Sequence, residues 1–271
     1  MVSEIKVIVL DIDGTLFNDE QKITPKTKEA LIRAQNEGCI VVLASGRPTS
    51  GLWYIADELE MDKHHGLLCS FNGSRVVDTL TTEIYFNAPM SVEDGRKVLE
   101  HVSKFDVNPM IYKDRYLYTP DAYAYKVKYE SDLGRLLVCE VSDIDLFLDW
   151  QANKILTSGD PEYLQAHYKE LMEPFKDTLN CMFTADFYFE FTAKGIDKAK
   201  ALGIALEKIG YSAENCIAFG DAQNDLPIIR FAKIGVAMGN ATDEVKAAAD
   251  VITDTNNNDG IVKMLNQYVF V

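Results

Sequence analysis

The chain has 271 residues, 47% of them hydrophobic and 25% charged, which is typical of a globular protein with one large domain or two modest ones. Its formal net charge of −15, with no offsetting basic stretch, argues against nucleic-acid binding. No stretch reaches the length of a membrane span, and the N-terminus has no signal-peptide pattern. Five cysteines without a CxxC pair are typical of reduced core thiols. We therefore expect a cytoplasmic protein that does not bind membranes.

The first predicted strand ends in two carboxylates. The apolar run of residues 7–10 suits a strand buried on both faces of a parallel sheet, and Asp11-Ile12-Asp13-Gly14-Thr15 follows it directly. Alternation along a strand predicts that Asp11 and Asp13 project the same way, at the sheet edge where ligands bind. Two carboxylates this close repel each other unless a cation or proton separates them, which indicates a hard divalent ion such as Mg²⁺. The alternative is a strand end with solvated aspartates in an Asx-type turn.

A βαβ unit is predicted next. Thr24-Pro25 begins a helix that should end near Gly38, and a strand over residues 39–44 ends in Ser45-Gly46-Arg47-Pro48. Because such crossovers join parallel strands, both polar motifs should lie at the same sheet edge. A helix over residues 52–59, a strand over 66–70 that ends at Asn72-Gly73, and a hairpin over 76–86 follow.

The middle of the chain changes character and predicts an inserted α+β domain. Strands are expected near residues 110–112 and 116–118, and helices near 93–103 and 162–172. Six tyrosines in this region either line a substrate entrance or coat one sheet face: Tyr112, Tyr116, Tyr118, Tyr123, Tyr125 and Tyr129.

Alternation of strand and helix resumes after the insertion. Asp197 is predicted to cap a helix over residues 198–208, and a strand over 216–219 ends in Gly220-Asp221, with Asn224-Asp225 just beyond. Strands over 234–238 and 250–253 and a helix over 260–268 complete the pattern. The predicted fold class is α/β, with a Rossmann-like, doubly wound, mostly parallel core of residues 1–84 and 192–271 and an α+β domain of residues 85–191.

Four polar features converge at strand ends or helix starts. They are Asp11 with Asp13, Ser45-Gly46, Lys198, and Asp221 with Asn224-Asp225. Each alone has an ordinary explanation, such as a turn, a surface lysine, or an acidic pair favoured by a helix dipole. Together they are the parts of a phosphoryl-transfer site, where positioning and charge neutralisation supply most of the catalysis.

The order of these motifs resembles the haloacid dehalogenase-like phosphatases, most closely the Cof-type sugar-phosphate phosphatases. The resemblance extends over essentially the whole chain, including the place and size of the insertion. The matching residues are Asp11-Ile12-Asp13-Gly14-Thr15-Leu16, Ser45-Gly46-Arg47-Pro48, Asn72-Gly73, Lys194-Gly195 followed by Lys198, and Gly220-Asp221-Ala222-Gln223-Asn224-Asp225. The lysine motif departs from the family, which often has glycine where this chain has Ala199. Lys194 and Lys200 therefore remain alternatives to Lys198 as the catalytic cation.

The resemblance implies a catalytic set and a metal. Asp11 would attack phosphorus and form a phospho-aspartyl intermediate, and Asp13 would act as general acid and then general base. Lys198 would offset transition-state charge. Mg²⁺ would be held by the Asp11 carboxylate, the Asp13 backbone carbonyl and Asp221, with Asp225 as a direct or indirect partner.

The resemblance also implies phosphate-binding residues and a cap. The residues expected to hold phosphoryl oxygens are Thr15, Ser45, Gly46 and Asn224, whereas Arg47 would contact substrate or pin an acidic residue such as Asp225. The inserted domain resembles the large cap that closes over the site in this family and chooses the substrate.

The expected function is a Mg²⁺-dependent phosphatase of small phosphorylated metabolites, such as sugar phosphates, in a monomer or weak homodimer. A sugar-phosphate phosphomutase is the first alternative, because it shares the chemistry. A non-catalytic regulatory protein that binds a sugar phosphate is the second. Binding alone needs no second aspartate at Asp13, which favours the enzyme. Haloalkanoate dehalogenation is disfavoured because Asp13 is the acid that phosphate-ester cleavage needs. A receiver domain is disfavoured because receiver domains have no insertion of this size.

Overall fold

The computed structural model describes residues 4–271, which form two compact units. The core unit contains the chain up to Ser45, Leu52–Phe86 and Asp197–Val271. The inserted unit contains Asn87–Ile196 together with the short segment Gly46–Gly51. This segment carries Gly46 and Arg47, which the sequence had placed in the core with the rest of their motif.

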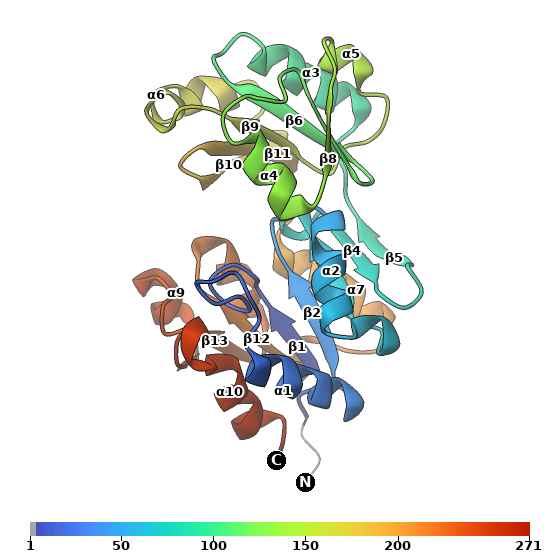
Figure 1. Ribbon diagram of the computed structural model, residues 1–271, viewed down its shortest axis with the longest axis vertical. Helices are drawn as coiled ribbons and strands as arrows, with labels where there is room; N and C mark the ends of the chain where they lie inside the picture. Colours follow the sequence, from blue (N-terminus) through green and yellow to red (C-terminus); the bar gives the residue numbers. More distant parts are fainter. Residues whose placement is uncertain (1–3) are drawn as a thin grey trace. The chain divides into compact units, whose positions relative to one another are not determined.

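The core unit is built on an eight-stranded sheet in the order β14-β13-β12-β1-β2-β3-β4-β5. Pairing is parallel from β14 through β3, and β4 pairs antiparallel with β3. The strands are β1 (Val7–Leu10), β2 (Ile40–Ala44), β3 (Leu67–Ser70), β4 (Arg75–Asp78), β5 (Ile84–Asn87), β12 (Cys216–Gly220), β13 (Ile234–Ala237) and β14 (Val251–Ile252). The predicted α/β class with a mostly parallel sheet is confirmed (Figure 1).

Six helices of the described chain accompany the core sheet. They are α1 (Pro25–Asn36), α2 (Ser50–Glu58), α7 (Lys198–Lys208), α8 (Leu226–Phe231), α9 (Asp243–Ala248) and α10 (Gly260–Tyr268). Capping explains two of the starts. The Thr24 hydroxyl accepts from the Thr27 N–H ahead of Pro25, and Asp197 accepts from the Lys200 N–H at the start of α7.

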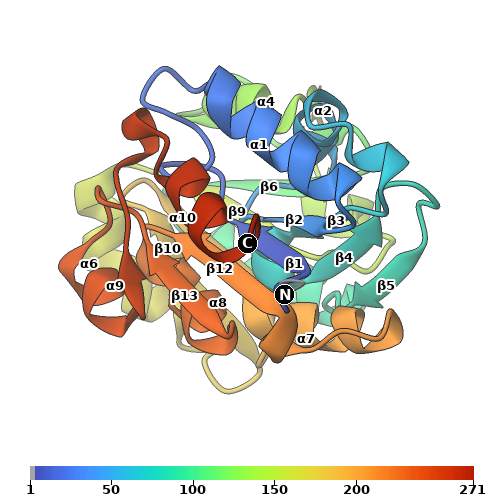
Figure 2. The same cartoon turned by 90° about the horizontal axis from the view of Figure 1, so that it is seen from below.

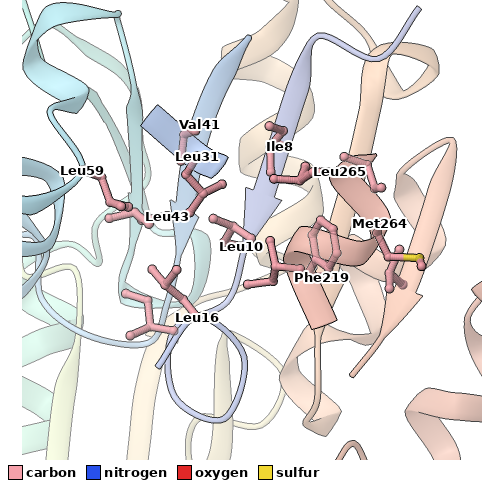
Figure 3. Packing of buried hydrophobic residues seen from close by; sticks show 14 of the residues in the cluster. Ile8, Leu10, Leu16, Leu31, Val41, Leu43, Leu59, Phe219, Met264 and Leu265 are labelled. Carbon is pink, nitrogen blue, oxygen red and sulfur yellow. The ribbon is translucent and has the colours of Figure 1, made fainter. Parts of the chain in front are cut away.

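The central strand is buried on both faces because helices cover both. Ile8 and Leu10 pack in one apolar cluster with Leu31 of α1 and Leu265 of α10, as Figure 3 shows. Residues between them along the strand, such as Val9, pack in a second cluster with α7. In Figure 2, α1 and α7 lie on opposite sides of the sheet. All four residues of β1 are fully buried, as the continuous apolar run predicted.

The inserted unit has its own sheet, in the order β10-β11-β9-β6-β7-β8. The pairs described are antiparallel except β7 with β8, which is parallel. The strands are β6 (Asn108–Lys113), β7 (Tyr116–Thr119), β8 (Leu137–Glu140), β9 (Ile155–Ser158), β10 (Leu179–Ala185) and β11 (Tyr188–Ala193). The helices are α3 (Val92–Val102), α4 (Val127–Gly134), α5 (Ile144–Phe147) and α6 (Pro161–Met172). An apolar cluster that includes Leu99, Ile155 and Phe189 forms its separate core.

The six tyrosines lie in several different environments and do not all share one sheet face. Tyr112 is buried, and its hydroxyl donates to Glu130 at 2.7 Å. Tyr118 stacks against Phe147 and Trp150, with Tyr116 beside it. Tyr125 and Tyr129 instead contact Phe187, and Tyr123 is 93% exposed. The sequence could not separate these environments because strand, loop and helix each contribute tyrosines.

The sequence predicted that the chain has no membrane span and that its cysteines are reduced core thiols. No helix in residues 4–271 is both long and apolar enough to cross a bilayer. The cysteines are free thiols: Cys39, Cys69 and Cys216 are buried, and Cys139 and Cys181 are partly exposed. The expectation of core thiols is therefore met at the first three positions and only partly at the other two.

Candidate active site

Three carboxylates meet at the carboxyl edge of the core sheet. Strand β1 ends opposite β12, and the Asp11 N–H continues the pairing with the Phe219 carbonyl at 3.1 Å. Asp11 follows β1, whereas Asp221 and Asp225 follow β12. One oxygen from each carboxylate lies within 4.8 Å of the other two. Parallel pairing thus brings together side chains that are more than 200 residues apart in sequence.

The aspartate motif lies in a turn and not on a strand. Strand β1 stops at Leu10, and the Leu16 and Phe17 N–H groups donate back to the carbonyls of Asp11 and Ile12. Asp11 is 6% exposed, whereas Asp13 is exposed to solvent. The strand alternation used in the sequence analysis therefore does not extend to these residues, because the backbone turns immediately after Leu10.

Gly14 allows this turn to pass close to Asp221. Its φ of +85° is the left-handed conformation that suits glycine, and a Cβ there would collide with the Asp221 carboxylate. The Thr15 hydroxyl donates to Asp221 Oδ1 at 2.9 Å. The first turn thus both leaves room for Asp221 and orients it.

Among the three candidate lysines, the structure places Lys198 beside the carboxylates. Its Nζ lies 2.8 Å from Asp11 Oδ1 and 2.6 Å from Asp225 Oδ1, and the residue is 1% exposed. Lys194 belongs to the inserted unit, where it donates to the Lys176 carbonyl at 2.7 Å. Lys200 is exposed on α7. Lys198 therefore has the position expected of the catalytic cation.

Asp225 uses both of its oxygens to build the site. Oδ1 accepts from Lys198, and Oδ2 accepts from the N–H groups of Asp221 and Ala222, each at 3.1 Å. The residue is completely buried. These contacts favour an indirect role for Asp225, which holds the Lys198 ammonium and the backbone of Asp221 in position.

In the described residues, one ammonium group, that of Lys198, forms ion pairs with this group of three carboxylates. Burial, followed by repulsion from Asp225, raises the pKa of Asp11 well above its usual value, and burial raises the pKa of Asp221 to about 6. Burial lowers the pKa of Lys198, but its attraction to Asp11 and Asp225 outweighs this and the net shift is upward. Three carboxylates against one ammonium leave two excess negative charges when all are ionised. Such an all-oxygen, anionic donor set fits a hard divalent cation such as Mg²⁺.

The expected phosphate-binding residues are placed as follows. Ser45 directly follows β2 and is buried; its N–H donates to the Cys69 carbonyl, and its carbonyl accepts from the Asn72 N–H. Asn224 is exposed and contacts Asn72 at 3.5 Å through its Nδ2. Both residues belong to the core unit.

Gly46 and Arg47 have contacts within the inserted unit. The Gly46 carbonyl accepts from Lys154 Nζ at 3.1 Å, and Arg47 Nη1 donates to the Leu133 carbonyl at 3.3 Å. Arg47 is buried, and its expected contact with substrate or an acidic residue stays a prediction, as does phosphate binding by the Gly46 N–H.

Sequence reasoning assigned no role to Asn72-Gly73, although it noted the motif. Gly73 has φ +96°, and a Cβ there would collide with the Asp197 carbonyl at the start of α7. The turn after β3 thus packs directly against the helix end that carries Lys198. The Asn-Gly pair, typical of left-handed turns, was the available signal.

Comparison with known proteins gives a consistent family. The family model described as haloacid dehalogenase-like hydrolase matches residues 8–265. The 5-amino-6-(5-phospho-D-ribitylamino)uracil phosphatase YcsE of Bacillus subtilis is 31% identical, with 98% of this chain and 96% of that protein covered.

Solved structures agree. A haloacid dehalogenase-like hydrolase from Bacteroides thetaiotaomicron superposes with a TM-score of 0.93 at 35% identity, covering 97% of this chain and 99% of that one. The subclass IIB sugar phosphatase BT4131 superposes with a TM-score of 0.80 at 26% identity, covering 98% and 100%. With its fold, its clustered carboxylates and these relatives taken together, the chain belongs to the haloacid dehalogenase-like hydrolases, among the Cof-type phosphatases.

Proposed function

We propose that the protein is a Mg²⁺-dependent phosphatase that hydrolyses small phosphorylated metabolites through a phospho-aspartyl intermediate on Asp11. The observation that carries this proposal is Lys198, buried between Asp11 and Asp225 with Asp221 alongside. A protein that only binds a sugar phosphate has no need for this costly buried arrangement.

In the first step, an Asp11 carboxylate oxygen attacks phosphorus and the bond from phosphorus to the leaving oxygen breaks. The leaving alkoxide takes a proton from Asp13, whose exposed carboxyl can meet an incoming substrate. Lys198 neutralises charge on Asp11 and on the phosphoryl oxygens.

In the second step, the Asp13 carboxylate takes a proton from water, the resulting hydroxide attacks phosphorus, and the bond to Asp11 breaks. Inorganic phosphate is released and Asp11 is regenerated. Asp11 and Asp221 would hold Mg²⁺ together with the Asp13 backbone carbonyl, and the ion would supply Lewis-acid stabilisation of the phosphoryl group. Ser45, Gly46, Asn224 and Thr15 are proposed to hold the phosphoryl oxygens, and Arg47 to contact substrate or pin an acidic residue.

Small phosphomonoesters are the proposed substrate class. The relatives named above act, by their names, on a phosphorylated ribityl compound and on sugar phosphates. We propose that the inserted unit acts as a cap that selects the leaving group and that the protein works in the cytoplasm, as a monomer or weak homodimer.

The test is a screen of the purified protein with Mg²⁺ against a panel of phosphorylated metabolites, scored by free phosphate. Phosphate release that EDTA abolishes is expected, and intact-mass measurement after a rapid acid quench should show a phosphate adduct on the parent. Asp11→Asn should show neither turnover nor adduct while it keeps the parent's circular dichroism.

Other outcomes would contradict the proposal. Isomeric sugar phosphates without free phosphate would identify a phosphomutase. Tight binding of a sugar phosphate with no turnover would identify a regulatory binding protein. Asp11→Asn activity within tenfold of the parent would exclude Asp11 as the nucleophile.

A further inference from the structure

Two asparagines hold the turn that follows the paired aspartates. In this turn, the Phe17 N–H donates to the Ile12 carbonyl at 2.8 Å. Asp13 and Phe17 also form an isolated parallel β-bridge. The side chains of Asn240 and Asn256, which come from the C-terminal part of the chain, donate to the carbonyls of Gly14 and Phe17 in this turn. All of these residues lie in the core unit.

Asn240 joins the turn to a second loop. Its Nδ2 donates to the Gly14 carbonyl at 2.7 Å, and its Oδ1 accepts from the Asn256 N–H at 3.0 Å. Both the nitrogen and the oxygen of the Asn240 carboxamide therefore have a hydrogen-bond partner. Two residues further on, the Thr242 N–H donates to the Asp221 carbonyl at 3.0 Å, so the same loop also contacts the backbone of a proposed metal ligand.

Asn256 holds the far side of the turn. The residue is 6% exposed, and its Nδ2 donates to the Phe17 carbonyl at 3.0 Å and to Asp19 Oδ1 at 3.2 Å. The Gly14 and Phe17 carbonyls thus both receive side-chain amide donors. These contacts span 226 and 239 residues of sequence, so they are part of the tertiary fold and not of the local turn.

The geometry matters because Asp13 is exposed and cannot be held by burial of its own side chain. The backbone around Asp13 contributes to its position, and a shift of about 1 Å in a catalytic group can cost on the order of 100-fold in rate. A turn fixed at both carbonyls limits such shifts.

We propose that Asn240 and Asn256 are positioning residues that act through the Gly14 and Phe17 carbonyls to hold Asp13 in place for proton transfer. The inference rests on the proposed phosphatase function, in which Asp13 protonates the leaving group. Loss of this positioning should therefore slow esters with poor leaving groups more than activated esters, which leave without protonation.

The experiment uses the full chain with Asn240→Ala, which alters an exposed residue. Asn258→Ala is the matched control, because Asn258 is also exposed and its Nδ2 donates to the nearby Thr255 hydroxyl at 3.0 Å. We expect Asn240→Ala to lose at least tenfold in kcat on an alkyl phosphate and less than threefold on p-nitrophenyl phosphate, with KM nearly unchanged. Asn258→Ala should match the parent on both substrates.

A second measurement does not need turnover. Hydrogen–deuterium exchange of the peptide that covers Asp13–Phe17 should be at least tenfold faster in Asn240→Ala than in the parent, and Asn256→Ala should show the same local change if it folds. Equal losses on both substrates, or unchanged exchange, would overturn the inference. A parent without turnover on any phosphomonoester would overturn the proposed function, and the exchange result would still decide whether Asn240 holds the turn.

Discussion

The ammonium group of Lys198 lies 2.6 Å from Asp225 Oδ1, and both residues are essentially inaccessible to solvent. Asp225 also caps the turn after β12 through its other oxygen. The pair therefore joins the start of α7 to the end of β12, and Asp11 completes it at 2.8 Å from the same ammonium.

Lys198→Met should reduce kcat by roughly 10²–10³-fold, because the variant loses the cation that offsets phosphoryl charge. It also leaves Asp11 and Asp225 buried without a counter-ion, which is expected to cost about 3–5 kcal/mol of unfolding free energy. Steady-state kinetics and urea unfolding measure the two effects. Lys200→Met, on the exposed side of the same helix, is the control and should retain parental activity. Equal losses in both variants would count against a specific role for Lys198.

Asp221 should make the effect of Mg²⁺ on stability depend on pH. Burial raises its pKa from 3.8 to about 6 in the folded, metal-free protein, so the folded state binds a proton that the unfolded state has released. This contribution to stability is complete below about pH 4 and is lost as pH rises through about 6.

Mg²⁺ binds the ionised carboxylate, so the increase in Tm caused by Mg²⁺ should grow between pH 5 and pH 7. Thermal unfolding with and without Mg²⁺ across this range is the measurement. Asp221→Asn should show a smaller increase with no rise near pH 6. A parental increase that falls with pH would contradict the prediction.

Gly14→Ala should abolish Mg²⁺ binding and activity, because the new Cβ would collide with the Asp221 carboxylate and φ is +85°. Gly38→Ala is a matched control: its φ is +91°, but nothing lies within 4 Å of the added Cβ. Both variants carry a left-handed strain of about 1–2 kcal/mol, and only the first disturbs the site. Calorimetric titration with Mg²⁺ distinguishes them, and intact Mg²⁺ affinity in Gly14→Ala would show that Asp221 is not a ligand.

Lys154→Met should destabilise the inserted unit. The buried Lys154 Nζ lies 3.7 Å from Glu130 and 3.9 Å from Glu190, and it donates to the Gly46 carbonyl at 3.1 Å. Its removal takes away the ammonium group that lies near both buried carboxylates, at an expected cost of about 3–5 kcal/mol. Lys128→Met, which removes an exposed pair with Asp132, should cost less than about 0.5 kcal/mol.

The measurement is urea unfolding followed by tryptophan fluorescence in a Trp53→Phe background, so that Trp150 of the inserted unit is the reporter. Adding Glu190→Gln to Lys154→Met should recover part of the loss, because one of the two buried negative charges near the missing ammonium is then removed. If Lys154→Met unfolds at the parental urea concentration, the buried cluster does not stabilise this unit.

The sequence alone determined the local elements and the chemistry available to them. The run at residues 7–10 is a fully buried strand, and the helices predicted at 198–208 and 260–268 have those bounds in the structure. The spacing of hydrophobic residues, the helix-capping residues and the glycines act over a few residues, so they predict secondary structure without knowledge of the tertiary fold. Parallel βαβ order was enough to place Asp11 and Ser45 after neighbouring strands at one sheet edge, and Asp221 was expected at the end of its own strand.

Tertiary structure decided which side chains meet. It placed Lys198, and not Lys194 or Lys200, against Asp11, and it engaged both oxygens of Asp225. It also grouped Gly46–Gly51 with the inserted unit and brought Asn240 to Gly14. These contacts depend on how loops pack when distant segments come together, and no local pattern of residue types encodes that packing. The residues that can do chemistry were therefore visible in the sequence, whereas their partners were fixed only by the fold.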